Sequence, residues 1–150
     1  MQISQFKKIF DGFREGNSEM FVYEELESPA SEGDIKLAEE RLNVVFPSEY
    51  KEFLLNFWGG YFVFVNVFSV SPESEWNIVE LQRKYDLPSN LVAISDDQAG
   101  GVYCFLIAQD GSCLSQVFYV YLSGDLIVPE KKFESFFEYL IVVGLHCRFE

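Results

Sequence analysis

The sequence has little of the chemistry that enzymes and metal sites usually require. Its 150 residues include a single histidine, His146, and three cysteines, Cys104, Cys113 and Cys147. No two of these cysteines have C-x-x-C spacing, and with one histidine they do not form a zinc-binding set. A catalytic histidine could pair with Cys147 only across adjacent helical positions, which do not face each other. These scarcities favour a non-enzymatic protein without metal or cofactor, whose cysteines are reduced in the cytoplasm.

Long apolar runs and phosphate-binding loops are also absent from the sequence. Apolar stretches such as Tyr61–Val65 have the length of a strand and fall far short of the roughly 20 residues that a membrane span needs. Residues 1–13 mix polar with apolar residues and contain no signal-peptide core. Gly59–Gly60 and Gly100–Gly101 lack the context of nucleotide-binding loops and are predicted to be turns. We therefore expect a cytoplasmic protein that neither crosses nor binds a membrane.

Positive charge is scarce, with 11 Lys and Arg against 24 Asp and Glu and a net charge of −13. This balance disfavours direct binding to nucleic acid or to anionic membrane, because both select clustered basic residues. Residues 15–35, 52–82 and 85–130 contain 7, 4 and 6 acids and no base. Such one-signed segments are expected of a surface that docks a basic partner protein. Acids that only solvate loop tips would give the same pattern, so both interpretations stay open.

Hydrophobic periodicity predicts helices at both ends of the chain and strands between them. The predicted helices cover residues 3–13, 32–42, 47–57, 76–85 and 133–143. Ser31 suits the N-cap of the second helix and Asn43 its C-terminal turn. The predicted strands cover residues 61–65, 67–70, 91–94, 102–108, 116–122 and 126–128, with a short extended segment at 20–26. This order predicts one α+β domain over residues 1–150, in which N-terminal helices and a C-terminal helix pack on a mostly antiparallel (mixed) β-sheet.

The predicted strand at residues 102–108 begins with six apolar residues and shows no polar alternation. A strand of this kind is usually covered on both faces. Helices of the domain can cover one face, whereas the other needs loops, a second copy of the chain or a partner. A homodimer is therefore possible, although the sequence does not require one.

Several motifs, taken in order, resemble the SUKH superfamily. The segments SEGDI (31–35), AEERL (38–42), FPSEYKEFL (46–54) and WGG (58–60) are similar to its N-terminal signature. The pair LVAISDD (91–97) and GGVYCFL (100–106) looks like its central strands, and FESFFEYL (133–140) looks like its closing helix. The resemblance to a SUKH-like domain is strongest over residues 30–143. Many members carry an acid near Leu106, and its loss here puts any role of that acid in doubt.

The resemblance implies an α+β fold with a mixed sheet and a function in the neutralisation of toxins. Most bacterial members look like immunity proteins that neutralise toxins delivered between neighbouring cells, often nucleases. This chain is most similar to the short type, which includes immunity proteins of LXG-type polymorphic toxins. A fungal member is linked to the regulation of cell-wall synthesis, so the alternative is a non-catalytic regulatory or scaffold domain. An enzyme is a third hypothesis, which a deep pocket with convergent carboxylates and a metal would favour.

The expected partner is a cognate toxin protein with a basic groove for phosphates. An acidic protein would be steered onto such a groove quickly and would block it. The candidate partner-binding residues are acids outside the main helices and two aromatic residues near them, because Trp and Tyr are enriched at binding hot spots. They are Glu24, Glu25, Glu27, Glu73, Glu75, Trp76, Asp96, Asp97, Tyr103 and Asp110. No catalytic, cofactor-binding or metal-ligating residue is predicted.

Overall fold

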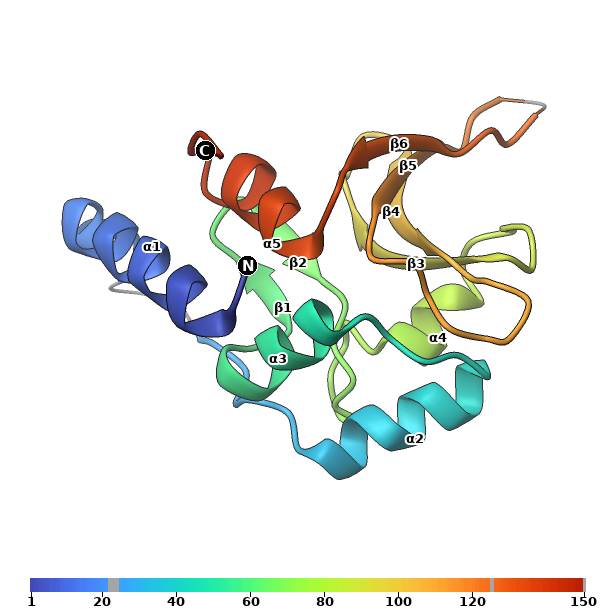
Figure 1. Ribbon diagram of the computed structural model, residues 1–150, viewed down its shortest axis with the longest axis horizontal. Helices are drawn as coiled ribbons and strands as arrows, with labels where there is room; N and C mark the ends of the chain where they lie inside the picture. The colour runs from blue at the N-terminus through green and yellow to red at the C-terminus, as the bar shows by residue number, and fades with distance from the viewer. Residues whose placement is uncertain (22–24, 125, 150) are drawn as a thin grey trace.

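The computed structural model describes residues 1–21, 25–124 and 126–149. The elements follow in the order α1 (Ile3–Gly16), η1 (Ser18–Phe21), α2 (Glu32–Leu42), α3 (Ser48–Asn56), β1 (Gly60–Phe62), β2 (Val65–Val67), α4 (Ile78–Gln82), β3 (Leu91–Asp96), β4 (Gly101–Leu106), β5 (Val117–Tyr121), β6 (Glu130–Phe133), α5 (Phe136–Tyr139) and the π-helical turn η2 (Leu140–Gly144). Strands β1 and β2 form a hairpin, and β3 to β6 form a four-stranded sheet in chain order. Figure 1 shows the four-stranded sheet at the upper right, with α1 at the left of the molecule and α3 and α2 along the bottom.

This arrangement confirms the predicted α+β fold with helices at both ends. Every ladder between the described strands is antiparallel. Parallel pairing occurs in the described residues only at two isolated bridges, Val45 with Ser112 and Ser69 with Asn77. Within the same residues, no helix is both long enough and apolar enough to cross a membrane.

Local signals explain where the helices begin and end. The Ser31 hydroxyl accepts a hydrogen bond from the Asp34 N–H at 3.1 Å, which satisfies one of the free donors at the start of α2. Asn43 ends this helix in the left-handed conformation, with φ of 56°. The sequence predicted Pro47 as the first helical residue of α3. In the structure Pro47 is the N-cap, and the helix begins one residue later, at Ser48.

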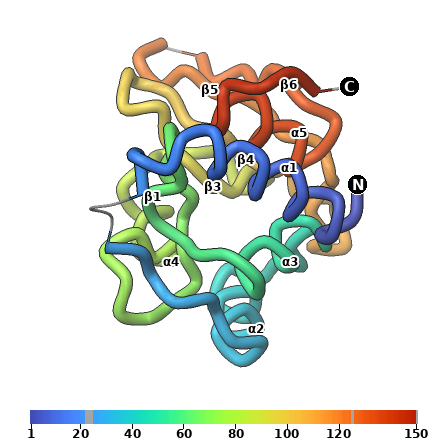
Figure 2. The backbone as a smooth tube through the Cα atoms, turned by 90° about the vertical axis from the view of Figure 1, so that its left-hand side faces the viewer, coloured from blue at the N-terminus to red at the C-terminus, as the bar shows by residue number. Residues whose placement is uncertain are grey.

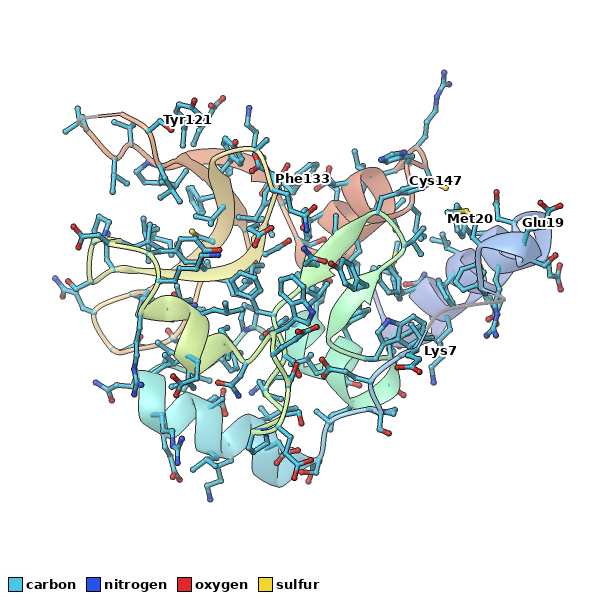
Figure 3. The ribbon with its side chains drawn as sticks, turned by 180° about the vertical axis from the view of Figure 1, so that it is seen from behind. Lys7, Glu19, Met20, Tyr121, Phe133 and Cys147 are labelled. Carbon is cyan, nitrogen blue, oxygen red and sulfur yellow. The ribbon has the colours of Figure 1, made fainter. Side chains whose placement is uncertain are left out.

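The core between α1, α3, α5 and the β1–β2 hairpin is built from aromatic rings. Phe6 on α1 stacks on Phe137 of α5 with ring centroids 4.7 Å apart, and its edge-on contact with Phe57 measures 5.2 Å. Such pairs each add about 0.5–1.5 kcal/mol beyond the area that they bury. Lys7 on α1, which is labelled in Figure 3, donates to the Asn56 side chain at 3.0 Å and so ties α1 to α3. Figure 2 shows α1 crossing the molecule in front of the strands, as this packing requires.

Strand β4 is covered on both faces within the described residues. On one face, Tyr103 contacts Tyr139 with ring centroids 4.7 Å apart, and Phe105 contacts the Tyr50 ring at 5.6 Å. On the other face, Cys104 is fully buried. The apolar run that suggested a second copy or a partner therefore finds its cover inside the chain.

The two edges of the four-stranded sheet are closed in different ways. At the β3 edge, the Gln82 side chain of α4 accepts from the Ala93 N–H at 2.8 Å and donates to the Ala93 carbonyl at 2.7 Å. Beside it, the Phe68 N–H donates to the Ile94 carbonyl at 2.8 Å. The opposite edge strand, β6, exposes charged residues at its first three positions, which discourages pairing with another strand.

Several predicted elements differ from the structure. The strands predicted at residues 61–65 and 67–70 are instead β1 and β2, with their turn at residues 63–64, and the helix predicted at residues 76–85 is limited to α4. The strand predicted at residues 126–128 is wrong, since Leu126 is 77% exposed and the last strand begins at Glu130. Phe133 ends that strand, so the closing helix starts later, after Ser135 caps it by accepting the Glu138 N–H at 3.2 Å. Met20 lies in the 3-10 turn η1, whereas the sequence predicted an extended segment from this residue.

Candidate functional site

A hollow of about 380 Å³ lies where the turn of the β1–β2 hairpin meets the end of β3 and the start of β4. We call it the hairpin groove. It brings together three of the predicted site residues, Asp96, Asp97 and Tyr103, with residues of the hairpin. Its lining consists of Tyr61, Val63, Phe64, Val65, Asn66, Asp96, Asp97, Gln98, Tyr103 and Val143.

Two residues that line the hairpin groove, Asn66 and Asp96, each have a buried oxygen atom without a hydrogen-bond donor. Asn66, on β2, is only 3% exposed, and its Oδ1 accepts no hydrogen bond from any described residue. The Oδ1 of Asp96, at the end of β3, is likewise buried and unpaired, while its Oδ2 accepts from the Tyr85 hydroxyl at 3.3 Å. Buried polar atoms are nearly always satisfied, because leaving one unpaired costs about 1–3 kcal/mol. Both oxygens lie beneath the accessible surface of the groove, so each lowers the stability of the fold without facing the opening.

Asp97 holds the turn between β3 and β4. Its Oδ1 accepts from the N–H groups of Ala99 at 2.8 Å and Gly101 at 2.9 Å, and its Oδ2 accepts from the Tyr119 hydroxyl. Partial burial alone would raise the pKa of Asp97, but these hydrogen bonds outweigh it and hold the pKa below its ordinary value. The same bond to Asp97 raises the pKa of Tyr119 to about 12. Asp97 therefore lends the groove a negative charge, while both of its oxygens already accept bonds within the turn.

The wall and rim of the hairpin groove are aromatic. Tyr103 lines the wall, where burial and the charge of Asp97 raise the pKa of its phenol, which stays neutral. At the rim, Tyr61 is 55% exposed and meets the Trp76 ring edge-on at 5.3 Å. Phe64 is 47% exposed and stacks on His146 with ring centroids 4.0 Å apart. Large exposed aromatic side chains beside a polar hollow are features of binding surfaces.

The hairpin turn itself is strained at Val63. This residue has φ of 54°, a conformation that β-branched side chains rarely adopt. The Phe64 N–H donates to the Gly144 carbonyl at 3.1 Å, so the turn is anchored to η2. Strain of this kind persists where the surrounding structure holds it, and it concentrates at functional sites.

Glu27 and Glu73 line a second hollow of about 380 Å³. The carboxylate of Glu27 accepts from the Ser69 hydroxyl at 2.7 Å and from the Ser74 hydroxyl, so it links the segment before α2 to the loop after β2. Trp76 follows this loop and reaches the rim of the hairpin groove through Tyr61. The second hollow and the hairpin groove therefore lie near each other on the molecule.

The remaining predicted residues lie apart from the groove lining. Glu25 and Glu75 are exposed. Asp110 is exposed in the loop after β4, where its Oδ1 accepts from the Ser112 hydroxyl at 2.6 Å and from the Ser112 N–H; the hydroxyl bond contributes most to the lowered pKa of Asp110. Glu24 lies outside the described residues. In the part of the chain that the structure describes, no group of three or more His, Cys, Asp or Glu side chains is placed to hold a metal ion.

Sequence reasoning missed the hairpin residues of the site. Asn66 is the single polar residue in the run from Tyr61 to Phe68, and this interruption of a buried strand was the available signal. A polar residue in such a run implies either a hydrogen-bond partner or a function. The exposure of Tyr61 and Phe64 has no comparable signal, because apolar residues of a short hairpin are equally compatible with a core.

The fold and the groove define a class: an α+β domain in which helices pack on antiparallel strands around an open, acceptor-lined hollow. A family model described as SMI1-KNR4 cell-wall (SUKH_6) matches residues 32–140, and the chain belongs to this family. The match confirms the resemblance to the SUKH superfamily. No curated protein sequence matches the chain.

Solved structures support the fold. A crystal structure of a protein from Pseudomonas syringae pv. tomato superposes with a TM-score of 0.63 at 22% sequence identity. The alignment covers 93% of this chain and 98% of that chain, so the two proteins have similar lengths and the same overall architecture.

Proposed function

We propose that the protein is an immunity protein, which binds a cognate secreted toxin in the cytoplasm and neutralises it by covering its active surface. Membership of the SMI1-KNR4 cell-wall family supports this proposal, because the bacterial SUKH proteins that the sequence resembles look like immunity proteins. The observation that carries it is the hairpin groove, in which the side chains of Asp96 and Asp97 lie beside the exposed rings of Tyr61 and Phe64. Neutralisation by occlusion requires no catalytic group.

The charge of the chain supports a basic partner, such as a nuclease domain. The net charge is −13, and Glu73 and Glu75 add exposed carboxylates on the loop that leads to Trp76. A toxin that binds phosphates carries a basic surface. Complementary charges accelerate encounter and exclude wrong partners, while buried aromatic anchors supply most of the affinity. Toxins of the LXG type are the partners that the sequence resemblance favours.

The proposal is tested by co-expression and by binding. The C-terminal domain encoded by an adjacent large gene is expressed in a sensitive host with and without this protein, and the toxin domain is then recovered through a tag on this protein. Rescue of growth with co-purification supports immunity. Toxicity that persists despite expression of the folded protein rules it out for that toxin.

The salt dependence of toxin binding gives an independent test of the proposed electrostatic attraction. Raising ionic strength from about 0.01 to 0.15 M shortens the screening length from about 30 to 8 Å. The association rate should therefore fall with salt, while the dissociation rate changes little. Replacing Glu73 and Glu75 by Lys should remove part of this dependence, and because both side chains are exposed we expect the fold to stay intact. An association rate that is indifferent to salt would refute steering.

The second candidate is a regulatory or scaffold domain, which the cell-wall description of the family favours. Such a domain would use the same groove without neutralising a toxin. A gene neighbourhood without a toxin gene, together with a defect in cell-wall synthesis after deletion of this gene, would favour this candidate.

A further inference from the structure

We draw no further inference here: the strongest candidate, the exposed apolar surface that Tyr121, Leu126 and Val128 form at the connection between β5 and β6, carries none because nothing in the described part of the chain shows what covers it.

Discussion

Replacing Asn66 with Leu should stabilise the protein. Leu has nearly the shape of Asn, so the substitution exchanges an unpaired buried oxygen for an apolar group without opening a cavity. An unpaired buried acceptor costs about 1–3 kcal/mol, and Asn66 is almost fully buried on β2. We expect the free energy of unfolding to rise by about 1–2 kcal/mol. For a chain of this length, that corresponds to roughly 2–8 °C in Tm.

Asn77→Leu is a control, in which the same substitution should lower the free energy of unfolding instead of raising it. It is 8% exposed, yet its amide is fully used: Oδ1 accepts from the N–H groups of Val79 at 3.0 Å and Glu80 at 3.2 Å, and Nδ2 donates to the Ser71 carbonyl at 2.9 Å. Asn77→Leu removes the N-cap of α4 and leaves that carbonyl unpaired. We expect a loss of about 2–4 kcal/mol.

Urea unfolding followed by circular dichroism measures both variants, with the denaturant slope checking that the transition stays two-state. The expected pattern is a higher midpoint for Asn66→Leu and a lower one for Asn77→Leu. If both substitutions destabilise to a similar degree, the Asn66 oxygen is satisfied in solution, which would refute the reasoning that it is an unpaired buried acceptor.

Three further outcomes test the structure around the groove and the core. Gly101→Ala would place a Cβ about 2.0 Å from the Tyr119 hydroxyl oxygen, so urea unfolding should show a loss of about 1–3 kcal/mol; a neutral result would contradict this close approach. The folded pKa of Asp97 is lowered and that of Tyr119 is raised to about 12, so their bond stabilises the fold between the unfolded pKa values of about 3.9 and 10. The stability advantage of wild type over Tyr119→Phe should therefore shrink as pH falls below about 4 and as it rises from 10 toward 12, and an advantage that does not vary with pH would refute this. Burial raises the pKa of Cys104 to about 12, so a thiol reagent at pH 8 should modify Cys147 first, and rapid labelling of Cys104 would show that the core opens.

Local signals made most of the fold predictable. The Ser31 cap and the left-handed Asn43 ended α2 where the sequence indicated, and the apolar runs marked β3, β4 and β5. The last strand was misplaced because pairing overrides composition: residues 126–128 are apolar but find no place in the sheet, whereas the polar segment from Glu130 pairs with β5, with Phe133 opposite Val117.

The acids of the site could be predicted from the sequence, but their arrangement in space could not. Composition identified Asp96 and Asp97 together, but only the structure shows that Asp97 holds a turn while Asp96 keeps one oxygen unpaired. Asn66 lies 30 positions earlier in the chain, and β2 brings it to Asp96 by packing beside β3. A single sequence contains no signal that two residues so far apart in the chain come together, because their proximity depends on tertiary packing.

The closed edges of the sheet have a consequence for how any partner can bind. The Gln82 amide and the Phe68 N–H occupy one edge, and charged residues line the other, so a partner cannot readily extend the sheet with a strand of its own. Binding by strand addition is nearly indifferent to sequence, since main-chain groups supply most of the affinity. Recognition here must depend on side chains instead. If a partner binds at the hairpin groove as proposed, exchanging a few residues around the β1–β2 turn would change which partner binds while the backbone stays unchanged.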